Sequence, residues 1–375
     1  MPDFSNTTIA IIGVGLMGGS LGLAARERLD VPRVIGYSRT ARTLKQALEL
    51  GAITDEAGSV EEAAADADII FVATPVRSIL EVIRQVMAAS GPGTIVTDIG
   101  STKSGLMHAL TAAEEKRFIG GHPVCGSETA GVGNSREELF DNATWFLTSG
   151  KGVDPSNYER LHGFISRIGA LPTAIDPDAH DRIMALVSHL PHVLANSAMN
   201  QVGGVNLDGR EALLSAGPSF KDLTRVAGSN PNVWTDIFME NRRWLGEALH
   251  EHRDSIDRII AAVEAGDETA LTAMISEAAA NHNRMLEAEQ LIPSELFVVK
   301  VPVFDRPGVF SQVTVVLGNA GINIEDLSFH RISAEQGGVL SLVVSGSETG
   351  SRAVGILQAL EYDAVAVPYT DAETG

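Results

Sequence analysis

Short apolar runs alternate with amphipathic segments through the first 175 residues of the chain. A run of about four to eight apolar residues between turn signals predicts a strand, and an apolar stripe with a period of about 3.6 predicts a helix. Strands are expected over 9–12, 33–37, 67–73, 93–97, from 118 onward, 144–148 and 171–175, and helices follow five of them. This alternation is typical of a doubly wound α/β domain with a parallel sheet, which binds ligands at the carboxyl ends of its strands.

From residue 176 to about residue 290 the pattern predicts only helices. On the first of them, expected over 178–202, three polar residues recur at helical spacing: Ser188 and His192 each fall within about 20° of Asp181 around the helix. Such residues on a largely apolar helix indicate a polar cleft, although a solvated face is the alternative. The later helices carry more apolar surface than one chain can easily cover, which predicts a homodimer.

In the last eighty residues the spacing of the apolar positions changes again and predicts both strands and helices. Strands are expected over 297–303, 322–330, 338–345 and 364–368, and helices over 308–320 and 351–360. This βαββαβ order predicts a ferredoxin-like unit without a cluster of titratable groups. The chain is therefore divided into a dinucleotide-binding domain (1–175), a helical substrate and dimerisation domain (176–292) and a regulatory domain (295–370).

Charge and cysteine content exclude several classes of function. The net charge of −20 argues against binding to nucleic acid or to anionic membranes. A single cysteine, Cys125, fits a reducing compartment. No apolar stretch approaches the roughly 20 residues of a membrane span, and no basic region precedes the first apolar run. We expect a cytoplasmic protein without a signal peptide, and we assign no metal ligands.

The first predicted strand runs into a Gly-x-Gly-x-x-Gly turn made by Gly13, Gly15 and Gly18, and Leu16 and Met17 begin the helix that follows. These glycines allow a tight turn, close approach of a pyrophosphate and close packing of helix on strand. The sequence therefore predicts a Rossmann-type dinucleotide site. Two further strand ends should contribute cofactor contacts: Ser38, Arg39 and Thr40 after the second strand, and Thr74 and Pro75 after the third. Because Ser38 and Arg39 stand where NAD-binding proteins usually carry an acidic residue, NADP is favoured over NAD.

Glycines are dense between residues 120 and 133, and we expect a sharply bent loop there. His122 lies in this segment, after a predicted strand, and is a candidate general base because histidine titrates near pH 7. Ser101 follows the fourth strand, at a strand end where ligands bind in such a sheet, with helix capping as the alternative. Cys125 is most simply a small packing residue.

Four motifs resemble those of the prephenate and arogenate dehydrogenases of tyrosine biosynthesis, and the resemblance covers nearly the whole chain. They are Gly13-Val14-Gly15-Leu16-Met17-Gly18-Gly19-Ser20-Leu21, Asp98-Ile99-Gly100-Ser101-Thr102-Lys103, Gly121-His122-Pro123-Val124-Cys125-Gly126-Ser127-Glu128, and Ser188-His189-Leu190-Pro191-His192 followed by Phe220-Lys221-Asp222-Leu223-Thr224-Arg225. Asp305-Arg306-Pro307-Gly308 and Gly321-Ile322-Asn323-Ile324 look like the signature of an ACT domain.

The resemblance implies oxidative decarboxylation of prephenate to 4-hydroxyphenylpyruvate, with hydride transfer to NAD or NADP. It implies that His122 acts on the substrate hydroxyl with Ser101 nearby, and that Arg225 grips a substrate carboxylate. The remaining pocket residues would be His192, Ser188 and Ser127, with Asp181 orienting His192 or Arg225. The ACT resemblance implies an amino-acid effector, expected to be tyrosine, held near Gly308 and Asn323.

Three alternatives stay open at this point. Arogenate differs from prephenate by an amine, which Glu128 could accept. A β-hydroxyacid dehydrogenase would need a lysine base on the helix after residue 176, and no lysine occurs between residues 176 and 202. A non-catalytic, cofactor-sensing protein would not need His122, Ser101 and Arg225 together.

Overall fold

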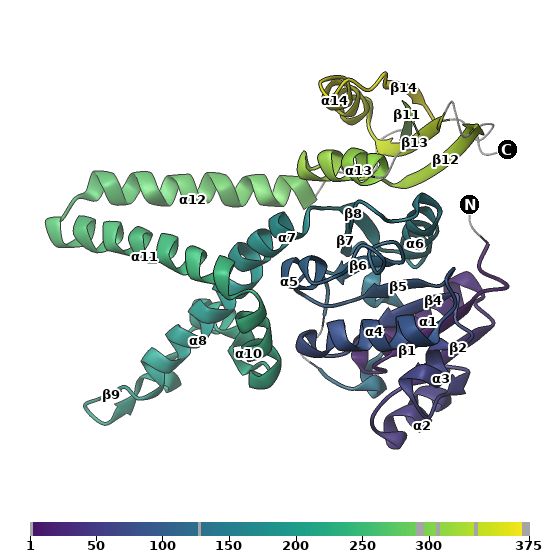
Figure 1. Ribbon diagram of the computed structural model, residues 1–375. Coiled ribbons are helices and arrows are strands. Elements are labelled where there is room, and N and C mark those ends of the chain that lie inside the picture. Colours follow the sequence, from purple (N-terminus) through teal and green to yellow (C-terminus); the bar gives the residue numbers. More distant parts are fainter. Residues whose placement is uncertain (1–2, 127–128, 290–295, 305–307, 334–336, 370–375) are drawn as a thin grey trace. The chain divides into compact units, whose positions relative to one another are not determined.

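The computed structural model describes residues 3–126, 129–289, 296–304, 308–333 and 337–369 (Figure 1). They form two compact units. The first comprises Met1–Asp181, Ser229–Glu240 and Glu295–Gly375, and the second comprises Arg182–Gly228 and Asn241–Ser294. The three-domain division predicted from the sequence stays a prediction.

The first unit is built on an eight-stranded sheet with the order β3-β2-β1-β4-β5-β6-β7-β8. Its strands are β1 (Thr8–Ile12), β2 (Arg33–Tyr37), β3 (Asp55–Glu56), β4 (Ile69–Val72), β5 (Ile95–Asp98), β6 (Phe118–Pro123), β7 (Thr144–Ser149) and β8 (Leu171–Ala174). Neighbouring strands are parallel except β6 and β7, which are antiparallel. The predicted parallel sheet is therefore confirmed except at this pair, and the short strand β3 was not predicted.

Successive strand residues point to opposite faces of this sheet. Both faces are apolar, and a layer of helices covers each of them. Ile9 and Ile11 join one core with α1, α2 and α6, whereas Ala10 and Ile12 join another with α3, α4 and α5. The helices of this part are α1 (Leu16–Leu29), α2 (Ala41–Glu49), α3 (Val60–Ala64), α4 (Ile79–Ala89), α5 (Ser104–His108), α6 (Pro155–Arg167), α7 (Pro177–Met184) and α10 (Pro231–Glu240).

Strand β6 corrects the expectation of a loop from residue 120. Gly120, Gly121, His122 and Pro123 all pair with β7 as sheet residues. A Cβ on Gly121 would lie 2.4 Å from the carbonyl oxygen of Asp98, and one on Gly120 would lie 2.3 Å from Oγ1 of Thr148. These glycines are therefore required by close packing rather than by a bend.

The C-terminal part of the first unit is a four-stranded antiparallel sheet with the order β12-β13-β11-β14. Its elements are β11 (Leu296–Val303), α13 (Val309–Asn319), β12 (Asp326–Ser333), β13 (Gly337–Ser345), α14 (Ser347–Gln358) and β14 (Val365–Pro368), in the predicted βαββαβ order. Its core continues into the large sheet, since the rings of Tyr158 on α6 and Phe310 on α13 are 5.6 Å apart.

The second unit is mainly helical. Its elements include a π-helix (Ala185–His189), α8 (Leu190–Gly203), β9 (Asn206–Leu207), β10 (Arg210–Glu211), α9 (Pro218–Leu223), the 3-10 turn η6 (Arg225–Gly228), α11 (Arg242–Ala265) and α12 (Glu268–Glu289). The single helix expected over 178–202 is thus interrupted by a π-turn, which changes the angular spacing along it. The β9–β10 hairpin was not predicted.

Candidate active site

The glycine turn between β1 and α1 has the predicted geometry. Gly13 has φ +109°, and a Cβ there would lie 2.4 Å from the carbonyl oxygen of Ala73. A Cβ on Gly18 would lie 2.4 Å from the carbonyl oxygen of Gly13, so only glycine lets the helix approach the turn this closely. No described atom lies within 4 Å of the Cβ position of Gly15, which leaves that backbone open to a ligand.

A cavity of about 720 Å3 lies at this turn. Six of the predicted cofactor residues line it: Gly13, Gly15, Ser38, Arg39, Thr74 and Pro75. Leu16 and Met17 instead form the first turn of α1 and pack partly against the core. Thr40 is exposed at the start of α2, outside the set of residues that line the cavity.

The lining fits a dinucleotide. Within the described part of the chain, Oγ1 of Thr74 is buried and has no hydrogen-bond partner, so a ligand in the cavity could supply one. The N-terminus of α1 presents backbone amides and a positive dipole end, which suits phosphates. Arg77 and Asp236 also line the cavity, and Nε of Arg77 lies 3.2 Å from Oδ1 of Asp236. Because Asp236 belongs to α10, this helix forms part of the cavity wall.

A buried ion pair fixes the loop that carries Ser101. The Asp98 carboxylate, at the end of β5, pairs with the Lys103 ammonium, and both side chains are fully buried. The same carboxylate accepts hydrogen bonds from the backbone N–H of Gly100 (2.8 Å) and of Gly121 on β6 (3.0 Å). Asp98 thus ties the Ser101 loop to the strand that carries His122.

His122 belongs to a chain of three polar side chains. Its Nδ1 lies 2.8 Å from Nε2 of His180 on α7, and Nδ1 of His180 lies 2.8 Å from Oδ1 of Asp181. Asp181 also accepts the backbone N–H groups of Lys103 (2.7 Å) and Ser104 (2.9 Å). His180 and Asp181 are almost completely buried, whereas His122 is half-buried.

This chain sets the tautomer of His122. Burial lowers the pKa of His180, so its ring is neutral near pH 7 and carries one proton. A carboxylate only accepts, so that proton belongs on Nδ1 of His180, toward Asp181. Nε2 of His180 must then accept from Nδ1–H of His122, which leaves Nε2 of His122 as the basic ring nitrogen. The positions of the ring protons of His122 and His180 are thus inferred from their hydrogen-bond partners.

Three of the substrate residues predicted in the helical region, Ser188, His192 and Arg225, lie in the second unit, whereas Asp181 lies in the first. Ser188 is half-buried in the π-helix, and His192 is buried at the start of α8, where burial lowers its pKa. Arg225 is exposed in η6, which packs against α8. His189 is buried, and its Nδ1 lies 3.1 Å from the side-chain nitrogen of Asn241.

The remaining predicted residues have varied outcomes. Ser127 and Glu128 lie outside the described residues. Burial raises the pKa of the Cys125 thiol to about 11, which agrees with a packing role. Gly308 precedes α13 with φ +86°, and Asn323 lies 3.3 Å from Oγ1 of Thr173 while donating to Glu325 (3.0 Å).

Sequence reasoning missed His180, and it also missed the ion pair between Asp98 and Lys103. The pair had a signal, because a lysine and an aspartate occur five residues apart in the motif that carries Ser101. His180 had only its neighbour Asp181 as a signal. Among the described residues no group of three or more His, Cys, Asp or Glu side chains could hold a metal ion. None of the described helices is long and apolar enough to cross a membrane.

Two protein-family models match the chain. The nucleotide-binding domain of prephenate dehydrogenase matches residues 21–172, and the prephenate dehydrogenase dimerization domain matches residues 176–277. Among curated proteins, a prephenate dehydrogenase of Bacillus subtilis is 31% identical over 363 residues, which are 95% of this chain and 97% of that protein.

Solved structures give the same relationship. Prephenate dehydrogenase from Aquifex aeolicus, in complex with hydroxyphenyl propionate and NAD+, has a TM-score of 0.72 at 27% identity and covers 76% of this chain and 100% of that chain. Synechocystis arogenate dehydrogenase has a TM-score of 0.64 at 27% identity, covering 74% of this chain and 99% of that chain.

Proposed function

Because the chain belongs to the prephenate dehydrogenase family, we propose that it converts prephenate to 4-hydroxyphenylpyruvate and CO2. The protein is an NAD(P)-dependent oxidoreductase. The observation that carries the proposal is the hydrogen-bonded chain Asp181–His180–His122, in which Nδ1 of His122 is oriented by His180 and Nε2 is the basic ring nitrogen.

Loss of hydride from C4 and of CO2 from C1 yields an aromatic ring. Formation of this ring supplies much of the driving force, so the protein needs mainly to orient the substrate and hold the proton of its hydroxyl group. NAD(P) bound in the cavity lined by Gly13, Gly15 and Thr74 would supply the hydride acceptor. His122 accepts the hydrogen bond of the C4 hydroxyl at Nε2 and draws the proton away as hydride leaves. The proton returns to the oxygen when the ring becomes a phenol, so no net proton is released. His180 and Asp181 stabilise the imidazolium while it exists.

Substrate carboxylates need cationic or hydrogen-bonding partners. We assign this role to Arg225, and we propose that His192, Ser188 and Ser127 also contribute to substrate binding. Arg225 is an exposed residue, which supports its assignment as a ligand-binding group. Ser101 would assist His122 from the loop that Asp98 holds.

Arogenate is the second candidate substrate. It carries an ammonium group where prephenate has a ketone, and Glu128 would accept that group. Similarity to Synechocystis arogenate dehydrogenase is the observation that favours it.

For the cofactor we favour NADP over NAD. Ser38 and Arg39 line the nucleotide cavity at the end of β2, where a 2′-phosphate would meet a guanidinium rather than a carboxylate. Replacing both residues (Ser38→Asp, Arg39→Ala) should move preference toward NAD, because a carboxylate pairs with the free 2′-hydroxyl and repels the phosphate. A wild-type enzyme that already prefers NAD contradicts this assignment.

One assay tests the function. Purified protein is incubated with prephenate or arogenate, each with NAD or NADP, while reduced cofactor and product are measured. We expect the highest kcat/KM with prephenate and NADP. Turnover of neither substrate with either cofactor would contradict the proposed function.

Assembly and regulation are further parts of the proposal. Helices α11 and α12 leave Ile260, Val263 and Ile275 largely exposed in the single chain, which supports a homodimer through these helices.

The βαββαβ part supports a ferredoxin-like ACT domain with tyrosine as effector near Gly308 and Asn323. Asn323→Ala should then weaken inhibition by tyrosine, whereas purely competitive inhibition that this variant leaves unchanged would assign tyrosine to the active site.

A further inference from the structure

The wall of the nucleotide cavity contains a charged cluster to which the proposed reaction gives no role. Arg77 lies in the 3-10 turn η1 (Val76–Ser78), after β4, whereas Asp236 and Glu240 lie on α10. Nε of Arg77 is 3.2 Å from Oδ1 of Asp236 and 3.8 Å from Oε1 of Glu240. Because the two carboxylates are four residues apart, they share one face of the helix. One guanidinium thus meets two carboxylates of α10.

The stability of the fold does not explain this cluster. The Arg77 side chain is 51% exposed, and the side chain of Asp236 is 27% exposed. Ion pairs this accessible to water contribute little to the free energy of unfolding, because solvent screens their charges. Burial of Ile237 on the same helix contributes more. The cluster therefore needs another explanation, and both Arg77 and Asp236 line a ligand cavity.

The charges that line the cavity indicate what a ligand would require there. Within the described part of the chain, the charged lining residues are Arg39, Arg77, Glu81 and Asp236. The net charge of −20 repels an anionic dinucleotide at long range, so its phosphates need cations close by. Arg39 and Arg77 follow β2 and β4, which flank β1 in the sheet. The two arginines therefore stand on opposite sides of the glycine turn that follows β1.

Arg77 has the donors that a phosphate group needs. A guanidinium presents several N–H donors in a planar fork, which matches phosphate oxygens. The atom of Arg77 closest to both carboxylates is Nε, and the terminal nitrogens lie beyond it on the side chain. Asp236 can therefore hold Nε while the terminal nitrogens meet a ligand in the cavity.

We propose that Arg77 binds the pyrophosphate of the cofactor and that Asp236 is the positioning residue that holds Arg77 in place. The inference rests on the proposed function for its use of NAD or NADP, but not for its choice of substrate. In a Rossmann-type site the pyrophosphate lies at the N-terminus of the helix after the glycine turn, whereas the residue that meets the ribose 2′ position follows the second strand. Arg77 follows β4, so its contribution should be equal for NAD and NADP.

The neighbouring carboxylate makes Arg77 more important than an isolated cation. Asp236 lines the cavity too, and its charge would repel the phosphates of the cofactor if the guanidinium were absent. Arg77 thus affects affinity in two ways, because it attracts the pyrophosphate and it neutralises Asp236. Substitution of Arg77 loses both contributions, whereas removal of the Asp236 charge as well restores the second.

Fluorescence titration of the full-length protein with NADH and NADPH tests the proposal without substrate. Arg77→Met should weaken binding of both reduced cofactors about ten- to a hundredfold, because a charge-assisted contact is lost. Binding of ADP-ribose, which carries the pyrophosphate but no nicotinamide, is measured by displacement and should weaken by the same factor. Arg77→Lys should recover part of the affinity, since it keeps the charge. Arg39→Ala should instead weaken NADPH far more than NADH.

A double-mutant cycle measures the part played by Asp236. In the Asp236→Asn background, Arg77→Met should weaken NADH binding by a smaller factor than in the wild type, because no carboxylate is then left unpaired beside the phosphates. Some loss should remain, because the contact with the pyrophosphate is absent in either background. The unfolding temperature should be nearly the same for every protein of the cycle, since the pair is exposed.

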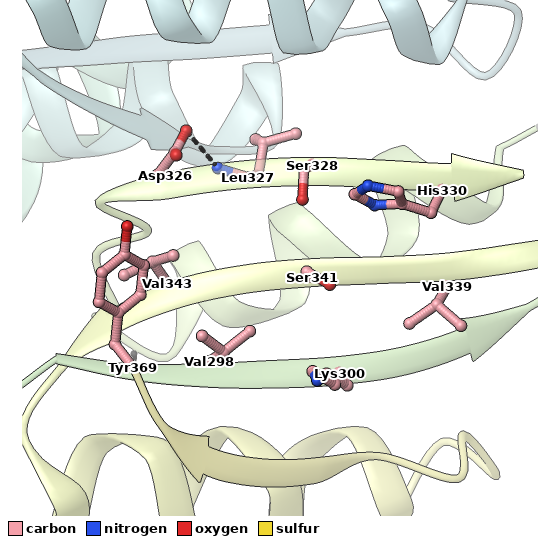
Figure 2. A pocket seen from close by; sticks show the side chains of 10 residues that line it. All are labelled: Val298, Lys300, Asp326, Leu327, Ser328, His330, Val339, Ser341, Val343 and Tyr369. Carbon is pink, nitrogen blue, oxygen red and sulfur yellow. Dashed lines mark hydrogen bonds between the residues drawn. The ribbon is translucent and has the colours of Figure 1, made fainter. Parts of the chain in front are cut away.

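Lys300→Met is the matched control. Lys300 lies on β11, in a separate cavity on the C-terminal sheet of the same unit, as Figure 2 shows. Its substitution removes the same charge without touching the nucleotide cavity, so cofactor affinity should stay at the wild-type value. A loss equal to that of Arg77→Met would mean that the titration reports net charge and not a contact of Arg77.

Three further outcomes contradict the proposal. Unchanged affinity of Arg77→Met for both reduced cofactors removes Arg77 from the site. A loss confined to NADPH assigns Arg77 to the 2′-phosphate instead of the pyrophosphate. An equal loss in both backgrounds of the cycle shows that Asp236 does not position Arg77.

The proposed function can fail separately from this inference. If the wild-type protein binds NADH and NADPH but turns over neither prephenate nor arogenate, the proposed reaction is contradicted, while the titrations still decide the role of Arg77. Wild-type protein that binds neither reduced cofactor contradicts both.

Discussion

The two units hold their functional polar groups in different ways. In the first unit, His122, His180 and Asp181 are linked to one another, and the last two are buried. In the second unit, Arg225 is exposed, and α11 and α12 carry exposed apolar side chains. The first arrangement sets protonation and orientation before a ligand arrives, while the second provides surface for a ligand or a second chain. Substitutions in the first unit should therefore lower kcat, and those in the second should change KM or assembly.

The largest effect is expected at His122. His122→Asn should lower kcat about 10²- to 10⁴-fold, the usual range for loss of a general base, while cofactor affinity stays near that of wild type. Steady-state kinetics with fluorescence titration of the reduced cofactor measures both. Turnover close to that of wild type would remove His122 from the mechanism.

His180 is expected to act through His122 as a positioning residue. His180→Phe keeps a ring between the two but removes the acceptor for Nδ1–H of His122, and it should lower kcat about ten- to a hundredfold, as loss of an orienting partner commonly does. The pH profile of kcat should change as well, because the imidazolium of His122 loses its stabilising partner.

His180→Gln serves as the control for this substitution, since an amide oxygen can accept the same hydrogen bond. It should restore part of the activity. Equal loss in both variants, with an unchanged pH profile, would show that His180 has only a packing role.

Pattern reasoning found the strand ends of the first unit because apolar runs and turn glycines are local signals. It placed Gly13, Gly15, Ser38, Arg39, Thr74 and Pro75 together, and these residues do line one cavity. It failed where the cause is distant in sequence. Gly120 and Gly121 suggested a bend, but they are required by Thr148 and Asp98, which lie across the sheet.

His180 illustrates a second limit. Its contact with His122 spans 58 residues, and its only local signal in the sequence is the neighbouring Asp181. The face shared by Asp181, Ser188 and His192 was derived from a constant angle of about 100° per residue. The π-turn at Ala185–His189 breaks that regularity, and a π-turn leaves no simple trace in an apolar pattern.

Substitution of Arg225 should raise KM and leave kcat nearly unchanged, in contrast to the substitutions of His122 and His180. Arg225→Ala removes a charge-assisted pair worth about 1.5–3 kcal/mol, which corresponds to a KM roughly ten- to a hundredfold higher. Arg225→Lys should recover part of this, because a lysine keeps the charge but not the paired geometry. A variant that loses kcat at unchanged KM would break the distinction drawn between the units.

The smallest effect on activity is expected at the exposed stripe of α11. Ile256, Ile260 and Val263 recur at helical spacing on one face, so a second chain could cover them together. Ile260→Glu would place a charge in that contact, and two copies would meet in a symmetric dimer. Sedimentation should then show dissociation to single chains at concentrations where wild type is dimeric, while activity per chain changes little. Arg258→Glu introduces the same side chain on the opposite face of the helix and should leave assembly intact. Ile260→Glu leaves the residues of the first unit unchanged. If it nevertheless abolishes activity as fully as His122→Asn does, catalysis requires the dimer, and the second unit does more than bind substrate and hold two chains together.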